Sequence, residues 1–547
     1  MEEIRNPILP GFHPDPSMIR VGEDYYIAVS SFEWFPGVPI YHSRDLVHWE
    51  LKRNVLDTVE QLDLTGLKPS WGVWAPNLSY CEQEKRFYLV YSIVHNNNPW
   101  FFDVDNYVVT ASSIEGEWSG PYYLNSSGFD PALFHDDDGR KWVVNKDRDF
   151  RPANLDNRAI VVQELDTARM RLTGSPTVVS RGATRRGFVE GAQIYKREGW
   201  YYLITAEGGT GYAHCVALSR SRSVTGPYEP CPFGPALTSI GGDLAGSEKA
   251  DLFMRPDLYN PETSIQKAGH GSLVETPNGE WYMAHLCGRP VMPGMHCILG
   301  RETSLQRMEW TEDGWLRVYG GGVIAQESAP APALPAHPFP AESPLEDFDS
   351  PVLNPHLYAP RGPIDAGWAD LETEPGRLRL RGRESLTSTY AVSLLARKLD
   401  SFHTRTTAKL EFQPELYHHL AGISCYYASQ DHYCAYKTFD ETLGGAVLKV
   451  HGFTGGAFKE YGKPVPLAAE APVFLRVETE NDKLSFFYSL DGERFEPLAE
   501  GLDLTPLSDE GCSCGVFTGT FVGLFAQDSH TREKWASFDF LRYERLD

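Results

Sequence analysis

The stretch GWYYLITAEGG at residues 199–209 decides the fold class, because related segments recur along the first 320 residues. They are EDYYIAVSSF near Tyr25, KRFYLVYSIV near Phe87, GRKWVVNK near Trp142 and GEWYMAHLCG near Trp281. Each is a short run of aromatic and β-branched residues bounded by Gly, Asp, Asn or Pro, a pattern typical of β-strands. A unit of several short strands, repeated at roughly 50 to 80 residues, indicates a β-propeller. Five copies predict five blades.

A second short apolar strand precedes each of these segments and begins near a distinctive residue. The five strands are HPDPSMI, WAPNLSY, FDPALFH, VEGAQIY and GHGSLVE, with Asp15, Trp74, Asp130, Glu190 and His270 as the distinctive residues. These residues precede the first bulky aromatic residue of the next segment by 10 to 13 positions. The first strand of each propeller blade lines the central axis. We therefore expect the five side chains to meet at one end of the channel, although the spread of offsets also permits a looser alignment.

Asp15 by itself, held between Pro14 and Pro16, is consistent with an ordinary turn. Placed together with Asp130 and Glu190, it becomes one of three carboxylates in a partly dry cavity, which is costly unless their protonation states differ. Acid–base catalysis is the usual reason for such a group. Glycoside hydrolysis needs an acid that protonates the leaving oxygen and a base that activates water.

Two other functions fit the same carboxylates. A Ca²⁺ site is the first, because carboxylates and carbonyl oxygens suit a hard cation. His270 and Trp74 fit a sugar pocket better than an all-oxygen cage. The second is a propeller that binds sugar without catalysis, which predicts binding with no turnover.

Composition narrows the partners and the location. The formal net charge of −24 argues against nucleic acid and anionic membranes, which need clustered Lys and Arg. We find no signal peptide and no run of about 18 apolar residues. The nine cysteines are scattered, which indicates reduced thiols, and their spacing does not predict structural zinc. We expect a cytoplasmic protein.

The length of 547 residues predicts more than one domain. We assign residues 1–319 to the propeller and residues 320–344, GGGVIAQESAPAPALPAHPFPAESP, to an extended linker that wraps the first domain. Short alternating strands return in residues 345–547 and predict a β-sandwich. This second domain either binds sugar or buttresses the propeller, and we favour the buttress. The predicted fold class is all-β.

Six segments together resemble glycoside hydrolase family 43, and most closely its two-domain β-xylosidases. They are NPILPGFHPDPSMIR, SSFEWFPGVPIYHSRDLVHWE, GVWAPNLSY, GFDPALFHDDDG, LITAEGGT and LGRETSLQ. The resemblance covers almost the whole chain. It implies a five-bladed propeller followed by a β-sandwich, and hydrolysis with inversion at the anomeric carbon.

The resemblance also implies roles for individual residues. Asp15 matches the general base, Glu190 the general acid, and Asp130 the carboxylate that raises the pKa of the acid and positions it. The residues implied to bind the cleaved sugar are Arg301 and His270 at the floor of its subsite, Phe32, Trp74 and Ala75 at its walls, and Phe521 of the sandwich at its mouth. Trp34 and Phe35 are either packing residues or rim contacts to sugar, and we favour the exposed rim. We expect HDDDG at residues 135–139 to be a hairpin turn rather than a calcium loop.

Some positions depart from the family pattern. His13 replaces the usual Asn, Asn77 replaces a common Asp or His, and KDRDFRPANLDNR lacks a Trp that often follows KWVVN. These differences leave the hydrolytic centre intact and put the leaving-group subsite in doubt.

The expected activity is exo-acting release of D-xylose from short β-1,4-xylo-oligosaccharides. The alternative is an α-L-arabinofuranosidase, or one enzyme with both activities. We expect no metal or other cofactor, with Ca²⁺ in the channel near His270 as the open exception. We also expect a homo-oligomer.

Overall fold

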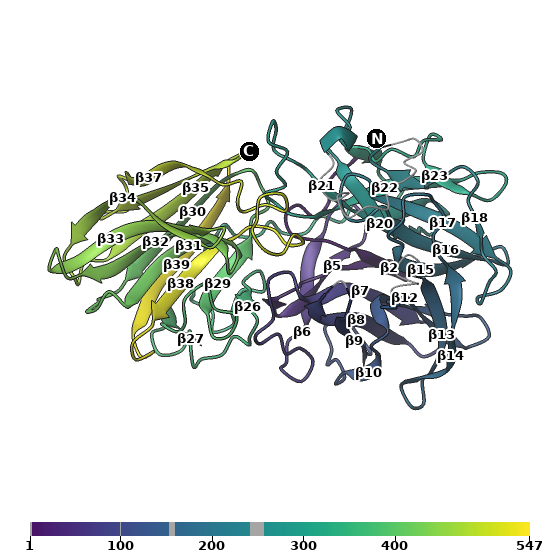
Figure 1. Cartoon of the computed structure of the whole chain (residues 1–547), viewed down its shortest axis with the longest axis horizontal. Coiled ribbons are helices and arrows are strands. Elements are labelled where there is room, and N and C mark those ends of the chain that lie inside the picture. Colours follow the sequence, from purple (N-terminus) through teal and green to yellow (C-terminus); the bar gives the residue numbers. More distant parts are fainter. Residues whose placement is uncertain (1–2, 99, 152–158, 241–255, 547) are drawn as a thin grey trace.

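The computed structural model describes residues 3–98, 100–151, 159–240 and 256–546, and it has two bodies that lie side by side (Figure 1). Within these ranges the regular elements are β-strands, apart from one 3₁₀ turn at Pro256–Leu258. None of the described segments forms a helix long and apolar enough to cross a membrane. The all-β prediction is confirmed.

The first body consists of five antiparallel sheets, each built mainly from four strands that are consecutive in the chain. Blade 1 contains β2 (Ser17–Val21), β3 (Asp24–Ala28), β5 (Gly37–Ser43) and β6 (Glu50–Leu56). Blade 2 contains β7 (Gly72–Cys81), β8 (Arg86–Asn97), β9 (Phe102–Ala111) and β10 (Tyr122–Asn125). Blade 3 contains β11 (Gly128–His135), β12 (Lys141–Asp147), β13 (Ile160–Asp166) and β14 (Arg171–Ser180).

Blade 4 contains β15 (Glu190–Arg197), β16 (Trp200–Glu207), β17 (Cys215–Ser221) and β18 (Glu229–Pro230), with β19 (Leu237–Thr238) also paired to β17. Blade 5 contains β20 (Gln266–Glu275), β21 (Trp281–Gly288), β22 (Glu302–Trp310) and β23 (Leu316–Val318). The five aromatic-rich segments of the sequence are the second strands of these blades. The predicted five-bladed propeller is confirmed.

The N-terminal segment helps to join the first and last blades of the propeller. β1 (Glu3–Arg5) pairs with β24 (Ser328–Pro330), and the side chain of Asn6 exchanges two hydrogen bonds of 2.8 and 2.9 Å with the backbone of Leu305. The amide of Met18 in blade 1 donates to the Ser272 hydroxyl in blade 5 at 2.8 Å. The first and last blades are therefore joined, and the ring cannot open without breaking buried hydrogen bonds.

Near the start of each inner strand lies an irregular residue whose backbone is left-handed. The φ angles at Asp15, Ala75, Asp130, Gly191 and His270 lie between 35° and 56°. In blades 2 to 5 the residue falls within a shift of register, as expected of a β-bulge. The equivalent positions in blades 2 and 4 are therefore Ala75 and Gly191. They lie one residue beyond Trp74 and Glu190, which the repeat analysis aligned.

The second body is a sandwich of two antiparallel sheets. One contains β27 (Ala369–Asp370), β28 (Leu378–Arg381), β39 (Trp535–Arg545), β30 (His403–Glu411), β35 (Val473–Glu480), β36 (Lys483–Ser489) and β37 (Glu496–Asp503), with β25 (Leu345–Glu346) on β39. The other contains β29 (Ser393–Lys398), β38 (Phe521–Asp528), β31 (His419–Ala428), β32 (Asp431–Asp440), β33 (Gly445–Thr454) and β34 (Ala457–Leu467). Leu410, Phe486, Ile423 and Leu524 belong to the apolar core between them. The predicted β-sandwich is confirmed.

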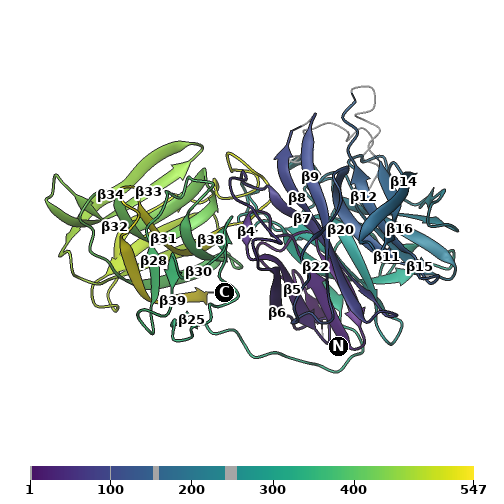
Figure 2. The same ribbon diagram turned by 90° about the horizontal axis from the view of Figure 1, so that it is seen from below.

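A long segment without regular strands follows β24 and runs from the propeller to the sandwich (Figure 2). Ala329 packs with Ile4 and Leu9 of the propeller, and the Ala333 carbonyl accepts a 2.7 Å hydrogen bond from Asn278. This part of the chain therefore follows the propeller surface before it reaches the sandwich.

The two bodies also pair directly. β4 (Trp34–Phe35) forms a two-stranded sheet with β26 (Ala359–Pro360) of the second body. Trp34 is 1% exposed and stacks on Phe521 with ring centroids 3.6 Å apart, and Phe35 is 3% exposed. The expectation that Trp34 and Phe35 form an exposed rim is wrong, because Trp34 packs against Phe521 of the sandwich and Phe35 lies in the apolar core of the first two blades. Residues 135–139 form the turn between β11 and β12, as predicted.

Candidate active site

A cavity of about 330 Å³ lies where the irregular starts of the inner strands converge. Asp15, Asp130, Glu190 and His270 all line it, as the repeat predicted. The full set of lining residues is Asp15, Phe32, Trp74, Asn97, Phe102, Phe129, Asp130, Lys146, Arg148, Phe188, Glu190, Thr210, His270, Arg301 and Phe517. The cavity thus combines aromatic walls with a small number of charged groups, as sugar-sized ligand sites do.

Asp15 is a buried carboxylate held in its ionised form. The Ser30 hydroxyl donates to its Oδ2 at 2.7 Å, and the Arg301 guanidinium donates to its Oδ1 at 3.2 Å. His270 Nδ1 lies 3.7 Å from Oδ1. Burial alone would raise the pKa of Asp15, but the charge of Arg301, followed by the neighbouring His270 and the Ser30 hydrogen bond, lowers it. Asp15 is therefore ready to accept a proton.

Asp130 lies beside Glu190 and is linked to it through the backbone. The Gly191 amide donates to Asp130 Oδ2 at 2.9 Å, so Asp130 holds the strand at the residue that follows Glu190. Burial, followed by the negative charges of Glu190 and Asp15, raises the pKa of Asp130 well above its usual range. Asp130 therefore binds a proton more readily than an ordinary aspartate does. Lys146 Nζ lies 3.4 Å from Glu190 Oε2 and orients the Glu190 carboxyl group.

Arg301 connects the propeller floor to the sandwich. Its Nε and Nη2 donate to the Phe517 carbonyl at 3.3 and 3.0 Å, and its guanidinium lies 5.3 Å from the Phe32 ring centroid. The preceding residue, Gly300, has φ +77°. A Cβ atom there would lie 2.1 Å from the Thr518 carbonyl oxygen, so only glycine permits this approach of the two backbones.

His270 is a buried neutral group beside Asp15. Burial lowers its pKa, although the charges of Asp15 and Glu190 act in the opposite direction. A neutral imidazole can donate one hydrogen bond and accept another. His270 thus has the chemistry to bind a sugar hydroxyl.

The aromatic walls are formed by two of the predicted residues and by several that sequence reasoning missed. Phe32 and Trp74 line the cavity as expected, with ring centroids 5.9 Å apart. Phe102 and Phe129 extend this wall, at 5.8 and 5.6 Å from Trp74. Ala75 does not line the cavity. Its amide donates to the Ser30 hydroxyl at 2.7 Å, so it supports Asp15 indirectly.

The sandwich residue at the cavity is Phe517, and the assignment of this position to Phe521 is wrong. Phe521 is completely buried against Trp34, inside the joint between the two bodies. Phe517 lies four residues earlier, in the same FTGTF motif, and its ring packs 5.6 Å from Trp74. The motif identifies the loop, but only the packing decides which of its two phenylalanines faces the cavity.

Lys146 and Arg148 were also missed. Lys146 pairs in register with Phe129 across β11 and β12, which places it beside the cavity. The signal in the sequence was that both residues lie in KDRDFRPANLDNR, the segment that departs from the family pattern, of which Lys146 is the first residue. Residues 152–158 of that segment lie outside the described residues.

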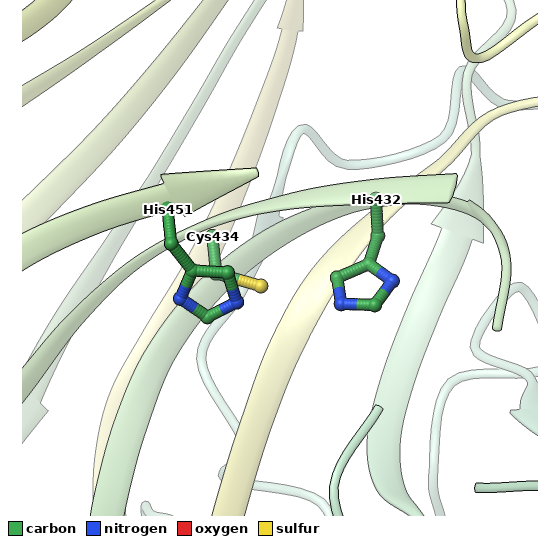
Figure 3. A group of neighbouring side chains, drawn as sticks. All are labelled: His432, Cys434 and His451. Atoms are coloured by element: carbon green, nitrogen blue, oxygen red, sulfur yellow. The ribbon is translucent and has the colours of Figure 1, made fainter. Parts of the chain in front are cut away.

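A separate group of metal-binding residue types lies in the sandwich, away from this cavity. His432 and Cys434 on β32 and His451 on β33 have ligand atoms within 4.8 Å of one another (Figure 3). Nitrogen and sulfur donors suit zinc or copper rather than Ca²⁺. Cys434 has the Ser424 hydroxyl as a hydrogen-bond partner, and His432 is stacked between Tyr426 and Phe453. The group packs within the sandwich and does not bear on chemistry at Asp15 and Glu190.

Comparisons with known proteins agree with this geometry. Residues 4–316 match the model for glycosyl hydrolases family 43, and residues 345–544 match that for the beta xylosidase C-terminal concanavalin A-like domain. The chain is 40% identical to a xylan 1,3-beta-xylosidase from a Vibrio species, across 99% of both chains. It is 39% identical to xylosidase/arabinosidase 43B from Humicola insolens, across 99% of this chain and 98% of the relative.

The crystal structure of xylan beta-1,4-xylosidase from Bacillus halodurans C-125 superposes with a TM-score of 0.93 and 47% identity, covering 99% of this chain and 100% of that one. The similarity therefore extends through both bodies and includes the sequence segments that carry the three carboxylates. The protein is a glycoside hydrolase and belongs to glycosyl hydrolase family 43.

Proposed function

We propose that the protein is an exo-acting, inverting β-xylosidase that releases D-xylose from the non-reducing ends of short β-1,4-xylo-oligosaccharides. The observation that carries the proposal is that one cavity holds an ionised, arginine-bound Asp15 together with Glu190 and with Asp130, whose pKa is raised. The names of the relatives support xylose as the sugar. The Bacillus halodurans structure is described as a xylan beta-1,4-xylosidase, and the Vibrio relative as a xylan 1,3-beta-xylosidase.

In the proposed reaction, Asp15 acts as the general base. It removes a proton from a water molecule, whose oxygen attacks the anomeric carbon on the face opposite the leaving group. Arg301 holds Asp15 in its ionised form and fixes the direction of its carboxylate. One displacement without a covalent intermediate inverts the configuration at that carbon.

Glu190 acts as the general acid at the other side of the bond. It donates its proton to the glycosidic oxygen as the bond from that oxygen to the anomeric carbon breaks. Asp130 positions it through the Gly191 amide, and Lys146 orients its carboxyl group. The reaction leaves Asp15 protonated and Glu190 ionised, so exchange of protons with solvent restores the starting state.

Burial around the cavity supports exo cleavage. Asp15, Arg301 and Phe32 are 6%, 2% and 2% exposed, and the sandwich loop at Phe517 packs on them. Asn97 is exposed, and Phe102 and Arg148 are half-buried. A chain can therefore enter only with its end at Asp15, and its leaving group extends past Phe102 and Arg148.

The second candidate is α-L-arabinofuranosidase activity, alone or with the first. It is favoured by the name of the Humicola insolens relative, which combines both activities. The two sugars present similar hydroxyl groups to the same cavity. Rates on the two aryl glycosides separate these candidates, and a strong preference for the arabinoside would overturn our first choice.

Three further expectations remain predictions. The carboxylates suffice for hydrolysis without a cofactor, and Ca²⁺ near His270 would act only on structure or on sugar binding. We also expect the protein to form a homo-oligomer and to be located in the cytoplasm, where it acts on imported oligosaccharides.

The experiment that tests the proposal compares Glu190→Ala on xylobiose and on an aryl xyloside with a good leaving group. Because only xylobiose needs protonation of its leaving oxygen, we expect a far larger loss on xylobiose. Equal losses would contradict the acid role. NMR of the first product formed should show α-xylose, and β-xylose would contradict inversion.

A further inference from the structure

We propose that an exposed aromatic surface outside the catalytic cavity binds the sugar units beyond the first leaving-group sugar. This surface, which we call the aromatic platform, consists of Trp100, Phe101 and Phe150. This proposal rests on the proposed function and deepens it. Binding to the platform makes the enzyme selective for oligosaccharides longer than xylobiose. None of its three members lines the catalytic cavity.

The platform is an exposed apolar cluster that requires an explanation. Trp100, Phe101 and Phe150 are 50%, 64% and 56% exposed. The rings of Phe101 and Phe150, which come from different blades, lie 5.7 Å apart. Single exposed apolar residues are common, but a cluster in a hollow of the surface indicates a binding site.

The platform continues directly from the catalytic cavity. It lines a groove of about 390 Å³ that shares two residues, Phe102 and Arg148, with the cavity. The Arg148 guanidinium lies 4.7 Å from the Phe102 ring centroid, so the two residues form one junction. A ligand that fills the cavity and extends past this junction enters the groove.

The groove extends from the cavity on the side where the leaving group lies. Lys146, which contacts Glu190, and Arg148 at the junction are two residues apart along the chain at the end of β12. The acid must lie at the glycosidic oxygen, so the path from Glu190 past Lys146 to Arg148 leads away from the cleaved sugar. The Asp15 end is closed, as described above.

The chemistry of the groove suits a chain of neutral sugars. The faces of a xylose ring carry C–H groups that stack on aromatic rings, and its edge carries hydroxyl groups. Asp103 and Asp147 also line the groove and can accept hydrogen bonds from those hydroxyls. Aromatic surface with a few polar groups is the usual composition of such sites.

Hydrogen bonds hold the backbone of Trp100 and Phe101, two of the three platform residues. The side-chain carbonyl of Asn98 accepts hydrogen bonds from the amides of Trp100 and Phe101 at 2.9 and 3.3 Å. Asn96 donates to the Phe101 carbonyl at 3.3 Å and to Asp103 at 2.9 Å. These contacts fix the backbone, so the aromatic side chains are presented rather than collapsed onto the propeller.

The test measures kcat/KM for an aryl xyloside, xylobiose, xylotriose and xylotetraose with wild type and with Trp100→Ala, Phe150→Ala and their combination. We expect about a three- to tenfold loss on the two longer substrates, the range of one or two aromatic contacts. The aryl xyloside and xylobiose, which end before the platform, should change less than about twofold. Phe458→Ala is the matched control, because Phe458 is 60% exposed but belongs to the sandwich.

Binding gives a second readout that does not depend on turnover. Calorimetric titration of xylotetraose into Glu190→Gln, with and without the platform substitutions, should show the same three- to tenfold weakening. If wild type fails to cleave any xylo-oligosaccharide, the proposed function falls, and this titration still decides the platform. Equal losses on all substrates, or unchanged binding, would overturn the platform. A lower oligomer mass for the variants in sedimentation, with no dependence on chain length, would assign the surface to contact between copies instead.

Discussion

The Arg301 guanidinium donates to the Asp15 carboxylate at 3.2 Å and, through Nη2, to the Phe517 carbonyl at 3.0 Å. One side chain thus joins Asp15 to the loop of the second body that packs at the cavity. If Asp15 is the base, as we propose, the sandwich is in a position to influence it through the backbone carbonyl that Arg301 contacts.

Arg301→Gln should move the acidic limb of the pH profile of kcat/KM to higher pH. Asp15 must be ionised to act as a base, and Arg301 is the leading charge that lowers its pKa. Removing that charge raises the pKa of Asp15, so activity is lost at higher pH as the solution is acidified. Arg307→Gln is the control, because Arg307 pairs with Glu280 instead. If the acidic limb of the kcat/KM profile does not shift in Arg301→Gln, Asp15 is not the base whose ionisation sets that limb.

Asp15→Ala should lose activity on every substrate by about 10³-fold, because all of them need activation of the attacking water. Steady-state rates on xylobiose and on an aryl xyloside measure this. The two losses should agree, in contrast to Glu190→Ala. Near-normal activity on either substrate would exclude Asp15 as the base.

Phe517→Ala should affect substrate binding, whereas Phe521→Ala should affect the stability of the fold. Phe517 lines the cavity, so its loss should raise KM several-fold with little change in thermal stability. Phe521 is fully buried against Trp34, so its loss should lower the free energy of unfolding by about 3–5 kcal/mol. Kinetics and denaturant unfolding measured on both variants test the pair. Reversed effects would place Phe521 at the mouth after all.

Glu33→Gln should change how stability depends on pH. Burial raises the pKa of Glu33 to about 7, opposed by the charge of Arg361, whereas an unfolded chain has a value of about 4.3. The stability that the protonated carboxyl contributes is complete below the unfolded pKa and is lost as pH rises through 7.

The variant should therefore gain about 3 kcal/mol relative to wild type between pH 5 and pH 8. Comparing the two proteins at both pH values cancels the constant effect of leaving Arg361 without its partner. Thermal or urea unfolding supplies the measurement. Parallel pH curves for the two proteins would mean that Glu33 does not titrate in this range.

The strand repeat was sufficient to predict most of the fold. Residues such as Tyr25, Phe87 and Trp142 recur in a fixed context because each blade must bury the same face, and that requirement is local. The inner-strand comparison also identified Asp15, Asp130 and His270 correctly as equivalent positions. It placed Trp74 and Glu190 one residue early, because a β-bulge shifts the register in a way that spacing alone does not reveal.

The sequence by itself therefore determined the five blades, the sandwich and the three carboxylates, since these follow from local strand patterns and from a repeated position. Only the tertiary structure decided which groups complete the site. Phe517 rather than Phe521 faces the cavity, and Arg301 reaches both Asp15 and the sandwich, because Gly300 lets two backbones from distant parts of the chain approach closely. Contacts between the bodies depend on how their surfaces fit together, and no local pattern in either segment records that fit.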